Sequence, residues 1–148
     1  MTIQEIQQEI IDELKIFDNL TDKYDYLVKL GKKLPPISSE YKTESNLIKG
    51  CQVKTWYYST FKEGKVFYEI DSLSGIVKGI IVLLLRILAG QKPENIANAD
   101  LYFIDKSGLT EIFSPIRANS LWKMVNRMKS DAALYEAEIA DESKYIKS

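Results

Sequence analysis

Apolar residues recur at helical spacing near the start of the chain. Residues 3–17 carry isoleucine, leucine and phenylalanine on one repeating face, and residues 20–31 carry a second such set. This period predicts two amphipathic helices. Gly31 and the pair Pro35-Pro36 predict the end of the second helix, because glycine accepts the left-handed stop conformation and proline does not extend a helix.

The most hydrophobic segment is GIIVLLLRILAG, residues 79–90. Lys78 and Arg86 bracket its unbroken apolar part, whereas a membrane-spanning helix needs about 18 or more apolar residues. Its apolar residues lie nearly all round the helix, which predicts a helix buried at the centre of the fold. Ser72 or Ser74 is the expected N-cap.

A β-hairpin is predicted before this central helix. The stretches QVKTWYYSTF and VFYEID are rich in β-branched and aromatic residues, and KEGK joins them with Gly64 at a position that favours positive φ. One face of the second strand is expected to carry Val66, Tyr68 and Ile70. Residues 36–51, before the hairpin, are polar and weakly periodic, which predicts mostly loop with room for a helical turn.

The rest of the chain predicts short elements and one long terminal helix. Pro93 fits the first position of a short helix, and residues 100–113 fit either a short helix or a strand. Ser114 and Pro115 open the last helix, which residues 134–148 either extend or leave as a frayed C-terminal extension. This order predicts an α+β fold, with a small antiparallel sheet of two to three strands packed against several helices.

The composition fits one globular domain over residues 1–148. Apolar residues make up 45% of the chain, charged residues make up 28%, and the net charge is −1. Lysine and arginine are scattered without a basic stripe, so we expect no nucleic-acid partner. The first residues, MTIQEIQQEI, do not resemble a secretory signal, and one cysteine forms no internal disulfide. We therefore expect a reducing, cytoplasmic location and no membrane partner.

The chain has no histidine and one cysteine, Cys51. Without histidine the usual general base, the Ser-His and Cys-His dyads and most zinc sites are excluded. The CxxC, GxGxxG and Walker motifs are also absent. The chemistry open to this chain therefore depends on the single thiol.

Cys51 lies in the stretch NLIKGCQ, at the end of the predicted loop. A free cysteine is often only a small buried hydrophobe. Here Gly50 lets the backbone bend and bares the next side chain, and Lys49 and Lys54 are cations that favour a thiolate. With no histidine and no second thiol, a reactive thiolate here suits exchange chemistry, in which it attacks a sulfur atom and another thiolate leaves.

Several motifs occur in a fixed order between about residues 15 and 130. They are YDYLVKLGKKLPP, Asn46, the sequence Gly50-Cys51-Gln52 followed by Trp56, Asp71-Ser72, IVKG, the step from Gly90 to Pro93, and SPIRANSL. With these motifs the chain resembles the SufE/CsdE family of sulfur acceptors in iron–sulfur cluster assembly. It departs from the usual family pattern at the middle of GCQVKTW and at Ile116 and Ser120.

This resemblance implies a SufE/IscU-like fold in which Cys51 carries a persulfide. A cysteine desulfurase of the SufS or CsdA kind, with its own pyridoxal phosphate, would supply the sulfur and be stimulated by its removal. A SufB-type scaffold would receive the sulfur. The chain would hold no cofactor and no metal, and would act as a transfer partner rather than a stand-alone enzyme.

The resemblance also implies supporting residues around the thiol. Arg117 is expected near the cysteine, where it would help a partner dock or steady the persulfide anion. Gly50, Gln52, Lys49 and Asn46 are expected to support the loop or border the partner.

Plainer interpretations remain open at these positions. Arg117 also fits a solvated surface arginine, Gln52 a bond within the loop, and Asn46 a turn former. Trp56 fits the core better than a docking surface. Three other functions stay in competition: a cluster scaffold, which needs several thiolates, an adaptor in which Cys51 is inert, and a stand-alone thiol enzyme, which would lack a base and a resolving cysteine.

Overall fold

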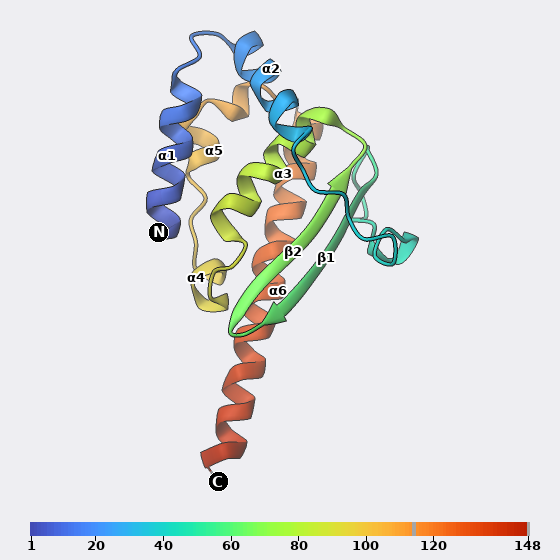
Figure 1. The fold of residues 1–148 in the computed structure, drawn as a ribbon, viewed down its shortest axis with the longest axis vertical. Coiled ribbons are helices and arrows are strands. Elements are labelled where there is room, and N and C mark those ends of the chain that lie inside the picture. The colour runs from blue at the N-terminus through green and yellow to red at the C-terminus, as the bar shows by residue number, and fades with distance from the viewer. Residues whose placement is uncertain (114, 148) are drawn as a thin grey trace.

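The computed structural model describes the backbone of residues 1–113 and 115–147 and the side chains of residues 1–113 and 118–142. The helices are α1 (Ile3–Lys15), α2 (Leu20–Gly31), α3 (Gly75–Leu88), α4 (Pro93–Ala97), α5 (Phe103–Lys106) and α6 (Pro115–Lys147). The strands are β1 (Thr55–Lys62) and β2 (Lys65–Ser72), and the 3-10 turns are η1 (Glu44–Asn46) and η2 (Leu109–Glu111). This is the predicted α+β architecture (Figure 1).

Helix α3 forms the centre of the molecule. It contacts α1, α2 and β2, and Figure 1 shows it between the N-terminal helices and the hairpin. Eight of its 14 residues are buried, and each large apolar side chain removed from water contributes roughly 1.5–3 kcal/mol. The predicted central helix is therefore confirmed. Ser74 is its N-cap, with its side chain accepting a hydrogen bond from Val77 N at 3.4 Å.

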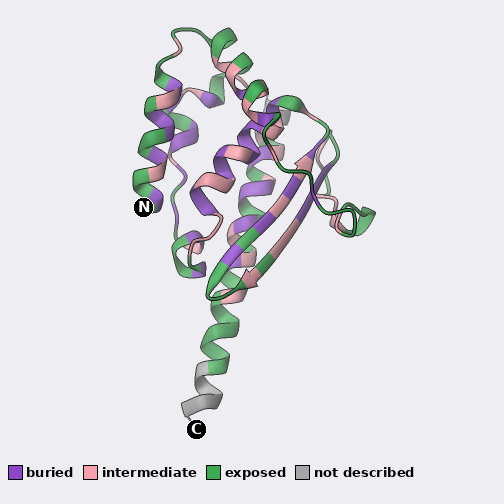
Figure 2. Ribbon diagram, in the orientation of Figure 1, coloured by how far each residue is buried: buried purple, intermediate pink, exposed green. Residues whose placement is uncertain are grey.

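Strands β1 and β2 form the predicted antiparallel hairpin, which closes where Lys62 pairs with Lys65. The two residues between them, Glu63 and Gly64, have φ values of 55° and 77°. Two positive φ angles in a two-residue connection match the twist of the flanking strands. Burial alternates along β2 (Figure 2), and the inward face carries the predicted residues Val66, Tyr68 and Ile70.

The hairpin holds α6 through two buried tyrosines. Tyr57 OH donates to Asp131 Oδ2 at 2.8 Å, and Tyr68 OH donates to Met128 O at 2.9 Å. Ser59 Oγ donates to the same Asp131 oxygen at 2.8 Å. Burial raises the pKa of Tyr57 and of Tyr68 far above the ordinary tyrosine value, and the hydrogen bond to Asp131 adds to this for Tyr57. Both phenols therefore stay protonated and keep donating to α6.

Helices α2 and α3 approach closely because glycines occupy their contact. A Cβ on Gly79 would overlap the carbonyl of Leu27, and a Cβ on Gly31 would lie 2.8 Å from Gly75 O. Gly31 ends α2 as predicted, but the predicted left-handed stop is wrong, because Lys32 follows it in the right-handed region and Gly31 has no positive φ. The reason for glycine at this position is the packing of α2 on α3.

The ambiguous segments of the chain are also assigned. Residues 100–113 form the short helix α5 and the turn η2 rather than a strand. Pro93 begins α4 as predicted, whereas the predicted cap Ser114 lies outside the described residues. Helix α6 continues through residues 134–147, and residues 136–142, beyond the hairpin, are exposed (Figure 2).

We expect Gly79→Ala to lower the free energy of unfolding by about 1–3 kcal/mol, the usual cost of an overpacked contact. The added methyl group would overlap a backbone carbonyl of α2, and backbone atoms do not move aside easily. The matched control is Gly75→Ala, whose methyl group would meet Val28 Cγ1 at an ordinary 3.8 Å. Urea unfolding measures both, and equal midpoints for the two variants would contradict the close-approach explanation.

Candidate functional site

Cys51 lies on the segment that we call the cysteine loop, residues 48–54. At the start of the loop, Ile48 N donates to the carbonyl of the first residue of β1 at 2.9 Å. At its end, Leu73 N donates to Lys54 O at 3.1 Å. Between these two anchors the thiol is free and half-buried. The loop therefore carries its cysteine beside the hairpin base and the start of α3.

Two features favour glycine at the position before the thiol. Gly50 has a φ of 83°, a conformation that strains residues with a Cβ. Lys123, on α6, donates from Nζ to Gly50 O at 3.2 Å, and a Cβ on Gly50 would overlap that ammonium group. The backbone conformation of Gly50 and the position of the Lys123 ammonium group therefore depend on each other.

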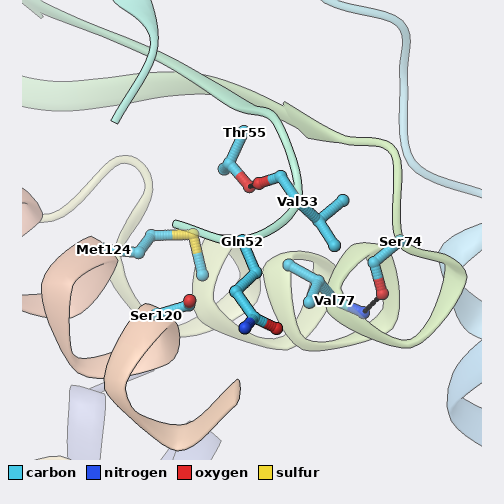
Figure 3. Close-up of a pocket in the computed structure, with 7 residues that line it drawn as sticks. All are labelled: Gln52, Val53, Thr55, Ser74, Val77, Ser120 and Met124. Carbon is cyan, nitrogen blue, oxygen red and sulfur yellow. Dashed lines mark hydrogen bonds between the residues drawn. The ribbon is translucent and has the colours of Figure 1, made fainter. Parts of the chain in front are cut away.

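A small pocket of about 90 Å³ lies under the residues that follow the thiol. Gln52 and Val53 line it from the loop, Val77 from α3, and Ser120 and Met124 from α6. Figure 3 shows the amide of Gln52 pointing between the two helices. The volume exceeds the roughly 10–15 Å³ that one water molecule needs, so the space has room for a small group beside the loop.

A larger groove of about 530 Å³ lies between the start of the cysteine loop and α6. We call it the cationic groove, because the described residues that line it include three cations and no acidic residue. The residues that line it are Ser45, Leu47, Ile48, Lys49, Lys123, Asn126, Arg127 and Ser130.

Trp56, at the start of β1, belongs to the core as the sequence favoured. Its side chain is buried, and Lys42 Nζ lies 4.7 Å from the ring centroid. Lys42 also approaches Asp71 Oδ2 at 3.4 Å. The polar segment before the cysteine loop is thereby fastened to the hairpin.

The predicted site residues that the structure describes differ in what they contact. Asn46 Nδ2 donates to Tyr41 O at 2.8 Å, which is the turn-forming interpretation. Lys49 is exposed on the cationic groove, and Gln52 is exposed on the small pocket. Arg117 lies in the first turn of α6, but its side chain is outside the described residues, so its approach to the loop stays a prediction.

The sequence did not identify Lys123 and Arg127 as candidate site residues. One signal was available, because the helical period puts a polar stripe opposite the apolar face of α6. That stripe carries Lys123, Asn126, Arg127 and Ser130. What the period does not reveal is that the start of the cysteine loop covers this stripe.

Comparison with known proteins identifies the family to which this fold and thiol belong. The model of the SufE family, an Fe-S metabolism associated domain, matches residues 8–132. The chain belongs to the SufE family. It is 33% identical over 129 residues to a SufE-like protein of Rhizobium meliloti, covering 84% of this chain and 92% of that one. A SufE-like protein of Synechocystis is 30% identical over 128 residues, covering 86% and 80%.

A plant relative and a solved structure extend the comparison. The SufE-like protein 1 of Arabidopsis thaliana, named as chloroplastic/mitochondrial, is 32% identical over 145 residues, which are 95% of this chain and 39% of that protein. A solution structure of a hypothetical protein from Thermus thermophilus superposes with a TM-score of 0.72 at 22% identity, covering 86% and 93% of the two chains. That likeness confirms the predicted fold.

Two further features concern the described part of the chain only. None of its helices combines the length and the apolar character needed to cross a bilayer. Its cysteine, aspartate and glutamate side chains form no group of three or more that is suited to hold a metal ion. The compartment of this chain stays a prediction.

We expect Gly50→Ala to break the hydrogen bond from Lys123, because the new methyl group would occupy the position of Lys123 Nζ. The lysine side chain is flexible and swings aside, so the free energy of unfolding falls only by about 1–2 kcal/mol, the cost of a left-handed residue with a Cβ. Amide hydrogen exchange in the cysteine loop should become faster, as it should in Lys123→Met.

The matched control is Gly64→Ala in the hairpin turn. Gly64 has a similar φ of 77°, but no other atom lies within 4 Å of the added Cβ. This variant should lose about as much stability and leave exchange in the cysteine loop unchanged. If Gly50→Ala and Lys123→Met both kept the exchange rates of the parent, Lys123 would not restrain the loop.

Proposed function

We propose that this chain is a sulfur carrier in iron–sulfur cluster assembly, loaded on Cys51 by a cysteine desulfurase and unloaded by a cluster scaffold. The observation that carries the proposal is a lone, half-buried thiol on an anchored loop, directly after a positive-φ glycine, in a member of the SufE family. The family is one of Fe-S metabolism, and the thiol supplies a group suited to sulfur exchange.

The loading step is a thiol exchange that needs no redox partner. The Cys51 thiolate attacks the terminal sulfur of a persulfide held on the desulfurase's cysteine. The bond between the two donor sulfurs breaks, and the donor leaves as a thiolate. Cys51 then holds the transferred sulfur and its proton as a persulfide, so atoms and electrons balance without an oxidant or a reductant.

The unloading step repeats the same chemistry with a different nucleophile. A thiolate on a SufB-type scaffold attacks the terminal sulfur of the Cys51 persulfide, and the Cys51 thiolate leaves. Since the chain has no second cysteine, no internal thiol competes for this sulfur. Half-burial of Cys51 also limits the access of oxidants that would convert the thiol to irreversible acids.

The desulfurase, of the SufS or CsdA kind, carries the pyridoxal phosphate, and this chain carries no cofactor. Removing the persulfide from the desulfurase frees its cysteine for the next turnover, so the chain acts as an activator in the cytoplasm. A cluster scaffold is the less suitable function, because assembly on protein takes several thiolates and this chain supplies one.

Incubation with a cysteine desulfurase and free cysteine tests the proposal. In an intact mass spectrum recorded without reductant, the parent should gain one sulfur atom, and the desulfurase should turn over several times faster. Cys51→Ser should gain no sulfur and give no stimulation, while its urea midpoint stays near that of the parent, because serine is nearly isosteric with cysteine. A parent that gains no sulfur, or a serine variant that gains as much, would contradict the carrier function; the first result would favour an adaptor with an inert cysteine.

A further inference from the structure

We propose that the cationic groove binds a carboxylate-rich segment of the protein that donates sulfur to Cys51. This inference rests on the proposed function, because it names the chemistry by which the donor docks beside that thiol. The groove is distinct from the small pocket under Gln52, and Lys49 alone lines it among the predicted site residues whose side chains the structure describes.

The charge of the groove is the first argument. Lys49, Lys123 and Arg127 line it, while the chain as a whole carries a net charge of −1. The groove is therefore a local positive region on a slightly acidic protein. Such a region steers an acidic partner and fixes its orientation.

The second argument is that these cations are available to a partner. Within the described side chains, neither Lys49 nor Lys123 forms an ion pair with a carboxylate. Lys123 Nζ donates a hydrogen bond to the neutral carbonyl oxygen of Gly50 at 3.2 Å. A carboxylate carries a full negative charge and attracts an ammonium group more strongly than a neutral carbonyl does, so an incoming acidic side chain would compete well for it.

Arg127 already contacts two other side chains, but it still presents N–H donors to the groove. Its Nε lies 3.4 Å from Asp131 Oδ1, and its guanidinium stacks over the ring of Tyr57 at 5.1 Å. The side chain is 57% exposed, and a guanidinium has five N–H donors. The contact with the Tyr57 ring restrains the guanidinium beside the groove, and a guanidinium is suited to paired hydrogen bonds with a carboxylate.

The third argument is the shape of the groove and its place beside the thiol. At about 530 Å³ the groove is comparable to sites that hold small ligands, so it accommodates a few side chains of an extended segment. Lys49 is two residues from Cys51, and Lys123 contacts the residue before it. A segment in this groove would lie against the loop that has to receive the sulfur.

We take the donor, rather than the scaffold, as the occupant, because membership of the SufE family supports a cysteine desulfurase as partner. A rival occupant is a second copy of this chain. The exposed end of α6 also carries carboxylates, on Glu136, Glu138, Asp141 and Glu142.

Binding to a cysteine desulfurase that loads the parent, measured by calorimetry at low and high salt, tests the groove. The double variant Lys49→Glu/Arg127→Glu should weaken binding by about tenfold or more, since close charge pairs at interfaces carry large coupling energies, and should flatten the salt dependence. The matched control is Lys62→Glu/Lys65→Glu, which makes the same charge change at the exposed hairpin tip. The control should bind within about twofold of the parent, because exposed charges more than a Debye length away are largely screened.

Three results separate the possible failures. If the groove variant binds and is loaded like the parent, the groove proposal is wrong and the carrier function stands. If both variants lose binding equally, the effect is one of overall charge and the groove proposal is also wrong. If light scattering shows that the parent self-associates, and the groove variant only abolishes that association, the groove is an interface between copies rather than a donor site.

Discussion

The hydrogen bonds that join β1 to α6 determine where the charged groups of the site lie. Asp131 accepts from both Tyr57 and Ser59 at 2.8 Å, and a buried donor left without its partner would cost about 1–3 kcal/mol. Because α6 is continuous from Pro115 to Lys147, fixing it at Asp131 also fixes the residues about one and two turns before it. Those residues are Arg127 and Lys123, which lie along the groove beside the cysteine loop.

The site combines a packed support with a short loop that carries the thiol. The hairpin, α3 and α6 form a packed frame, while the cysteine loop touches that frame through its two ends and through Lys123. Chemistry that needs only a thiolate and an incoming sulfur does not require a positioned base, which is consistent with a chain that has no histidine. What such a carrier needs from its fold is controlled access to the thiol and a surface that distinguishes its partners.

The fold was largely predictable because its signals are local. The alternation at Val66, Tyr68 and Ile70 and the all-round apolar helix each reflect a periodicity within one segment, and Gly64 marks a turn by its own backbone preference. Gly31 misled the prediction, because the residue is explained by the backbone of α3 rather than by its own φ. Lys123 was missed for the same reason: only the tertiary fold brings residues 73 positions apart into contact. The order of the family motifs pointed to Cys51, but it carried no information about the groove on which the loop lies.

The most direct measurement of the central claim is the persulfide occupancy of Cys51 in the cells that make this protein. Alkylation at harvest followed by peptide mass spectrometry distinguishes the trapped persulfide from the trapped thiol. The account predicts a persulfide fraction on the Cys51 peptide that falls sharply when the cysteine desulfurase is depleted. A Cys51 that is never persulfidated, or whose occupancy is unchanged without the desulfurase, would contradict it.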